Sequence, residues 1–112
     1  MAHVTGHTGP IGQTGTAGTT AAGRKVLTLE QLRARRELAR ARGERVVQCH
    51  GCFDIVHPGH IRHLRQAKGY GDILLVTITG DEAWTKRQGA PLIPEELRAE
   101  NLAELDCVDW VY

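Results

Sequence analysis

The stretch 51–60, which reads GCFDIVHPGH, constrains the fold most, because it joins a strand-like segment, 45–50, to a helix-like segment, 58–68, through a tight turn. His57 and His60 therefore stand at the N-terminus of a helix, three residues apart. Free backbone N–H groups and the helix dipole favour an anion at such a position. The sequence predicts that this turn binds a phosphate group.

Strand-like and helix-like segments alternate through the rest of the chain. The run 73–79 is continuously apolar and β-branched, which is typical of a strand buried on both faces. A helix is expected at 94–105 and a third strand at 107–112. The expected core residues of that helix are Leu97, Leu102 and Leu105. The β-α-β-α-β order predicts an α/β fold with a Rossmann-like parallel sheet and flanking helices, whose ligands bind beyond the carboxyl ends of the strands.

Two further segments precede this domain. Residues 1–23 are rich in glycine and threonine and almost lack large apolar side chains, so we expect a disordered tail. Residues 24–43 predict a basic amphipathic helix, in which Thr28 and Gln31 form a capping box and a glycine supplies the stop. Its arginines are more typical of a solvated face than of a phosphate or nucleic-acid patch. The residues available for its packed stripe are Leu29, Leu32 and Leu38.

Composition narrows the class of protein. The 112 residues leave room for one small domain. A formal net charge of +1 gives no bulk attraction to nucleic acid or membranes, and no apolar run approaches the length of a membrane span. Three cysteines, an odd number, give no disulfide framework. We therefore expect a cytoplasmic, reduced protein with neither nucleic acid nor a membrane as its partner.

The pattern GCFDxxHxGH resembles the signature of the HxGH nucleotidyltransferases, the cytidylyltransferase-like superfamily. Within it, the chain most resembles the adenylyltransferase domain of ADP-heptose synthases, and residues 44–112 correspond to the N-terminal portion of such a domain. The other matching segments, in family order, are 71–76, 79–81, Lys86, 94–100 and 108–109. The resemblance implies the Rossmann-like fold of HIGH-type nucleotidyltransferases.

The resemblance also implies a reaction. Members of this kind transfer AMP from ATP to a sugar 1-phosphate and release pyrophosphate, a step of carbohydrate metabolism. The expected partners are a nucleoside triphosphate and a phosphorylated small-molecule acceptor, with Mg²⁺ held largely by the phosphates and a homodimer as a possible assembly. A CTP-dependent cytidylyltransferase acting on glycerol 3-phosphate or a phosphoethanolamine-like acceptor is the alternative, and the sequence leaves the choice open.

Three residues are the candidate catalytic groups. The resemblance implies that His57 and His60 donate hydrogen bonds to the phosphate oxygens, and that Lys86 closes on the triphosphate from a mobile loop. Arg87 follows where the family more usually has glycine, so either cation could take that role. His63, one helical turn beyond His60, is expected to be exposed or to pack.

The remaining candidates are expected to bind nucleotide. Gly51 allows close backbone approach, and the adjoining pair is expected to contact nucleotide through its backbone. Asp54 could either orient a motif histidine or cap the turn, and the sequence does not favour one role over the other. Asp81 follows the second strand, where it either contacts substrate or holds the loop in place. Arg98 either lies near the phosphates or pairs with a glutamate on the helix surface. The full set is Gly51, Cys52, Phe53, Asp54, Gly59, Asp81, Arg87 and Arg98.

Three competing hypotheses remain. Cys49 and Cys52 form a CxxC that also occurs in thioredoxin-like redox motifs, and with His57 and His60 they could be imagined as a zinc site. We disfavour both, because the helix starts too late for the thiols and because zinc would divert the histidines from phosphate. The third concerns completeness: the family fold continues with further strands and a Ser/Thr-rich phosphate motif, which we do not find after His60. We therefore expect an incomplete domain with an exposed first strand, which could also act as an inactive binding or dimerisation module.

Overall fold

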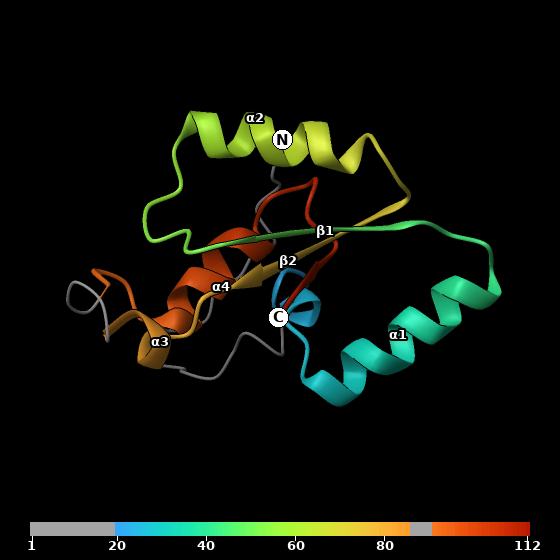
Figure 1. The fold of residues 1–112 in the computed structure, drawn as a ribbon, viewed down its shortest axis with the longest axis horizontal. Coiled ribbons are helices and arrows are strands. Elements are labelled where there is room, and N and C mark those ends of the chain that lie inside the picture. Colours follow the sequence, from blue (N-terminus) through green and yellow to red (C-terminus); the bar gives the residue numbers. More distant parts are fainter. Residues whose placement is uncertain (1–19, 86–90) are drawn as a thin grey trace.

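The computed structural model describes residues 20–85 and 91–112, and it is built from short helices around three strands (Figure 1). The elements in chain order are a 3₁₀ turn η2 (Gly23–Lys25), α1 (Leu29–Ala41), β1 (Val46–Gly51), α2 (Pro58–Lys68), β2 (Ile73–Ile78), α3 (Asp81–Thr85), α4 (Glu95–Ala103) and β3 (Trp110–Val111). None of the helices in these two described ranges is long and apolar enough to cross a membrane.

The three strands form one parallel sheet in the order β1-β2-β3. Val46 pairs with Ile73 at one end of β1, and Gly51 pairs with Ile78 at the other. The last strand is short and pairs through Trp110 and Val111 with the middle of β2. This arrangement confirms the predicted α/β class, and it leaves β1 at the edge of the sheet within the described residues.

Helices cover both faces of the sheet. One face packs against α2 and α4, and its cluster contains the fully buried Leu64, Leu74, Leu102 and Val111. The other face packs against α1, through a smaller cluster made of Leu27, Leu32, Ala39, Leu75 and Trp110. Figure 1 shows α1 and α2 on opposite sides of the strands. The predicted layered core is therefore present, with β2 buried from both faces.

The first helix begins as its sequence predicts. The Thr28 side chain accepts a hydrogen bond from the Gln31 backbone at 3.1 Å, and the Gln31 side chain accepts from the Thr28 backbone at 2.9 Å. This reciprocal pair satisfies two N–H groups that the helix cannot bond internally. The arginines of α1 are exposed, as on a solvated face.

Several core expectations are wrong. Leu97 is 48% exposed, because α4 turns the residues around Arg98, Ala99 and Leu102 toward the sheet instead. On α1, Leu29 and Leu38 are also exposed, since only the narrow line through Leu32 and Ala39 reaches the strands. The expected tail ends earlier than Gly23: Ala22 is 5% exposed within the α2 and α4 cluster. The rest of that expectation, residues 1–19, lies outside the described residues.

Candidate active site

The turn after β1 holds an unusual backbone conformation. Phe53 has a φ of +50°, a left-handed conformation that is energetically unfavourable for residues other than glycine. The residue is only 8% exposed and packs in the core. A Cβ added to Gly51 would lie 2.8 Å from the ring carbon Cε2 of Phe53. Glycine is thus required at position 51 because the buried ring folds back over it.

The two motif histidines are fixed by the start of α2. His57 is the N-cap, and its Nδ1 accepts a hydrogen bond from the Gly59 backbone N–H at 3.0 Å. The Nδ1 of His60 accepts in turn from the His57 backbone N–H at 3.3 Å. A ring nitrogen that accepts carries no proton, so the neutral form of each ring holds its proton on Nε2. Both imidazoles therefore present an Nε2 donor away from the helix.

Ring packing holds this pair together. The His57 and His60 rings stack with centroids 3.9 Å apart and an interplanar angle of 27°. The ring of Phe53 meets His60 edge-on, with centroids 5.5 Å apart. A Cβ on Gly59 would lie 2.8 Å from Cε1 of His57, so glycine is required there for the stack to form. The structure brings these predicted residues together, and their packing explains both glycines.

A cavity of about 710 Å³ lies beside this turn. The end of β1 and the turn form one wall, and His60 and His63 of α2 contribute to another. His50 also lines it, and its two ring nitrogens lie 2.7 Å from Thr77 Oγ1 and 3.4 Å from Thr79 Oγ1. The cavity thus joins the start of α2 to the carboxyl end of β1, and parallel α/β sheets bind ligands at the carboxyl ends of their strands.

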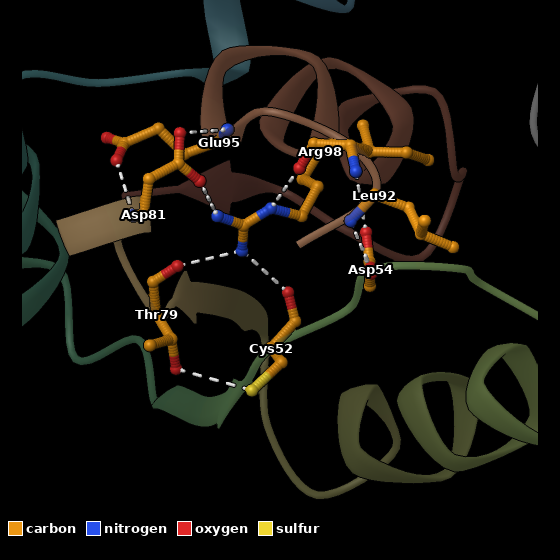
Figure 2. A network of polar contacts seen from close by, with 8 residues as sticks. Cys52, Asp54, Thr79, Asp81, Leu92, Glu95 and Arg98 are labelled. Atoms are coloured by element: carbon orange, nitrogen blue, oxygen red, sulfur yellow. Dashed lines mark hydrogen bonds and ion pairs between the residues drawn. The ribbon is translucent and has the colours of Figure 1, made fainter. Parts of the chain in front are cut away.

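Arg98 lies beneath the turn, and its side chain is fully buried. Its Nη1 donates to the carbonyl oxygens of Cys52 at 2.8 Å and Thr79 at 2.7 Å, and its Nε donates to that of Ile93 at 2.9 Å. Its Nη2 lies 2.6 Å from the Asp81 carboxylate (Figure 2). Of the two roles left open for Arg98, the surface pair with a glutamate is excluded, because α4 points this residue inward.

Two carboxylates complete the network in Figure 2. Asp81 and Glu95 each accept from the other's backbone N–H, at 3.2 and 2.9 Å, so each caps the start of the other's helix. The backbone hydrogen bond from Glu95 holds the pKa of the Asp81 carboxyl below its usual range, with help from Arg98 and against a partial burial that raises it. Asp81 is therefore the ionised partner of the buried guanidinium.

Asp54 ties the turn to the segment before α4. Its Oδ2 accepts from the Leu92 N–H and its Oδ1 from the Ile93 N–H, both at 2.9 Å (Figure 2). Of the two roles left open for this residue, the geometry favours the structural one, because both carboxylate oxygens face these backbone groups. Sequence reasoning missed Glu95, Thr79 and Ile93 as parts of the network, since no spacing signal links them to the turn.

Two of the other candidates, Lys86 and Arg87, lie outside the described residues. The two cysteines of the CxxC pattern lie within them. Cys52 is exposed, with Sγ 3.7 Å from Thr79 Oγ1, whereas burial raises the pKa of the Cys49 thiol. A raised pKa is the opposite of what a reactive redox thiol needs. Within the described ranges no group of three or more His, Cys, Asp or Glu side chains is arranged to hold a metal ion.

A parallel α/β sheet whose first strand turns into a histidine-capped helix defines the class of Rossmann-like nucleotidyltransferase folds. The sequence profile of the family described as Cytidylyltransferase-like matches residues 48–112, more than half of the chain, and the chain belongs to that family.

Individual relatives agree with this assignment. The Bifunctional protein HldE of Hahella chejuensis is 46% identical over 92 residues, which are 80% of this chain and 19% of that protein. The protein of the same name from Pseudomonas paraeruginosa is 47% identical over 90 residues, 79% of this chain and 19% of its own. The crystal structure of the lipopolysaccharide core biosynthesis protein from Thermoplasma volcanium matches with a TM-score of 0.59 at 35% identity, over 62% of this chain and 57% of that one. The chain spans about a fifth of the length of the curated relatives it matches.

Proposed function

We propose that this chain carries the phosphate-binding part of an adenylyltransferase site, which transfers AMP from ATP to a sugar 1-phosphate as in ADP-heptose synthases. The observation that carries the proposal is the stacked imidazole pair, whose Nδ1 atoms are both engaged by backbone N–H groups. Two outward Nε2 donors at a helix N-terminus suit the non-bridging oxygens of a triphosphate. The similarity to the HldE proteins supports the same class of reaction.

The reaction needs positioning and charge stabilisation more than covalent help from the protein. An oxygen of the acceptor phosphate forms the new bond to the α-phosphorus as the α–β bridging bond breaks, and pyrophosphate leaves with the bonding electrons. Donors aimed at the developing charge supply most of the catalysis in such steps. His57 and His60 are the donors we assign, and Lys86 or Arg87 is proposed as the closing cation.

Mg²⁺ enters this proposal with the triphosphate. Asp54 and Asp81, the carboxylates nearest the turn, are both occupied by protein donors. The described residues therefore do not fit a magnesium site built from side chains, and the phosphates are the expected ligands.

The proposal is tested by nucleotide titration of the full chain. The histidine ring signals are followed by NMR during additions of Mg·ATP and, separately, of Mg·CTP. We expect selective shifts of two rings with ATP at lower concentration than with CTP, and loss of binding in His57→Ala and His60→Ala. Arg33→Ala is the matched control, because that exposed residue lies on α1 and does not line the cavity.

Two results of the titration would change the proposal. If CTP binds more tightly than ATP, the proposed adenylyltransferase is replaced by a CTP-dependent cytidylyltransferase, which is the alternative within the same class. A folded chain that ignores both nucleotides would contradict the proposed site. In an assay of nucleotidyl transfer, either alanine variant should slow pyrophosphate release by about 10²–10³, the usual cost of removing one such donor.

A second candidate of another class is a binding module. It is favoured by one observation: within the described residues, β1 pairs with β2 on one side only. An unpaired strand edge is a template for pairing with another chain. If the chain dimerises through β1, sedimentation should show a dimer that a proline at Gln48 abolishes.

A further inference from the structure

We infer that Arg98 is a positioning residue that fixes the phosphate-binding turn from below, in place of the direct phosphate contact that the family resemblance suggested. The inference rests on the proposed nucleotide site, because it assigns how that site is held. It rests on the burial of Arg98, on the groups that accept its hydrogen bonds and on the geometry of the trans peptide bond.

The acceptors of Arg98 lie at the carboxyl ends of two neighbouring strands. The last backbone hydrogen bond between these chain segments runs from the Thr79 N–H to the Gly51 carbonyl at 3.0 Å. Beyond it, the Nη1 of Arg98 bridges the carbonyls of Cys52 and Thr79, so a side chain continues the connection where the ladder stops (Figure 2). The guanidinium thereby sets the spacing between the end of β2 and the turn after β1, which lines the cavity.

This contact also sets the direction of backbone donors. In a trans peptide the C=O and the following N–H point in opposite directions, and the structure has no cis peptide among the residues it describes. The Cys52 carbonyl points at the buried guanidinium, so the Phe53 N–H points away from it. The same holds for the Thr79 carbonyl and the Gly80 N–H. Arg98 thus turns both N–H groups away from itself, and one of them belongs to Phe53, which lines the cavity.

Arginine is specifically suited to this task. Burying a cation is unfavourable unless its donors are satisfied, and here three carbonyls and the Asp81 carboxylate satisfy them. The planar fork of a guanidinium reaches acceptors in several fixed directions, whereas a lysine ammonium is a compact group with three donors. The left-handed Phe53 is a strained conformation that such surrounding contacts can hold.

The test uses the full chain and four variants: Arg98→Ala, Arg98→Lys, Asp81→Asn and, as the control, Arg33→Ala on the exposed side of α1. Ligand-free ¹H–¹⁵N spectra report the turn through the amides of Phe53 and Gly80, and the signals of α1 and β3 report folding. Mg·ATP is then titrated into each folded variant. Millimolar guanidinium is added to Arg98→Ala to occupy the vacated site.

We expect both Arg98 variants to shift the turn amides without ligand and to weaken Mg·ATP binding about tenfold or more, as loss of charged hydrogen bonds does. Guanidinium should restore both readouts in Arg98→Ala, and Arg33→Ala should match the unsubstituted chain. Weaker binding with unshifted ligand-free amides would indicate direct phosphate contact and overturn the inference. If the folded molecules of an Arg98 variant bind Mg·ATP with normal affinity, Arg98 only stabilises the fold, and the inference is also overturned.

Two safeguards keep the test decisive. If neither Arg98 variant folds, Asp81→Asn decides, because it keeps the arginine and removes the charge that fixes Nη2, leaving one side-chain oxygen for the guanidinium and the Glu95 N–H together. Unshifted turn amides there would contradict the inference. If the unsubstituted chain binds no Mg·ATP, the proposed function fails. The ligand-free amide shifts then still show whether Arg98 sets the turn.

Discussion

Replacing Gly59 by alanine separates the histidine pair from the stability of the fold. The added Cβ would lie 2.8 Å from Cε1 and 3.1 Å from Nδ1 of His57, closer than side-chain carbons approach. The backbone of α2 is fixed by Pro58 and the cap, so the imidazole must move by several tenths of an ångström. That movement disrupts both the 3.0 Å bond to the Gly59 N–H and the stack on His60.

Stability should change little in this variant. Loss of an N-cap hydrogen bond costs about 1 kcal/mol, and alanine in place of glycine inside a helix returns up to about 1 kcal/mol. The two effects nearly cancel, so the denaturant midpoint should stay close to that of the unsubstituted chain. Nucleotide affinity should instead fall about tenfold to a hundredfold, because a displaced donor no longer meets the phosphate.

The assay pairs urea denaturation with Mg·ATP titration on Gly59→Ala and on a matched glycine variant, Gly69→Ala, at the other end of α2. Gly69 has an ordinary helical φ of −64° and no contact with the histidines among its near neighbours. Its variant should bind Mg·ATP within about twofold of the unsubstituted chain, as substitutions away from a site do. Normal affinity and unmoved His57 ring signals in Gly59→Ala would refute the reasoning.

Three further predictions follow from the same geometry. Gly51→Ala should destabilise the fold by about 1–3 kcal/mol, measured by urea denaturation, because its Cβ overpacks against the buried Phe53 ring. Folding lowers the pKa of the Asp81 carboxyl. The stability that this residue contributes is therefore fully present above the usual aspartate pKa of about 3.9, and it is lost as the pH falls through the lowered pKa. In Asp81→Asn, the free energy of unfolding should depend less on pH in that acidic range. Iodoacetamide should alkylate the exposed Cys52 faster than Cys49, whose thiol pKa burial raises, and Mg·ATP should slow the reaction at Cys52; equal rates, read by mass spectrometry, would contradict the thiol assignment.

The sequence predicted the elements whose signals are local. The helix 58–68 has the predicted bounds, and the first two strands end within one residue of the predicted positions, because a proline start, a cap and an apolar run act over a few residues. The third strand is shorter than expected. Only Trp110 and Val111 find partners on β2, and that pairing depends on how α4 returns the chain to the sheet.

The polar network could not be predicted in the same way. Arg98 meets Cys52 across 46 positions and Asp54 meets Ile93 across 39, so no spacing pattern reveals either contact. An apolar residue on a helix is ordinarily expected in the core and a charged one at the surface, and on that basis Leu97 was predicted to be buried. The structure instead buries the neighbouring Arg98, whose guanidinium joins α4 to the turn after β1 and to the end of β2.

The central claim is that the paired imidazoles present Nε2–H donors to a phosphate. Ring ¹⁵N spectroscopy of the full chain, with and without Mg·ATP, tests it most directly. The account predicts that neutral His57 and His60 carry their proton on Nε2, and that these two Nε2 signals move on nucleotide addition while the bonded Nδ1 atoms stay acceptors. Protons on Nδ1 in the free protein, or Nε2 signals that ignore Mg·ATP in a folded chain, would contradict it.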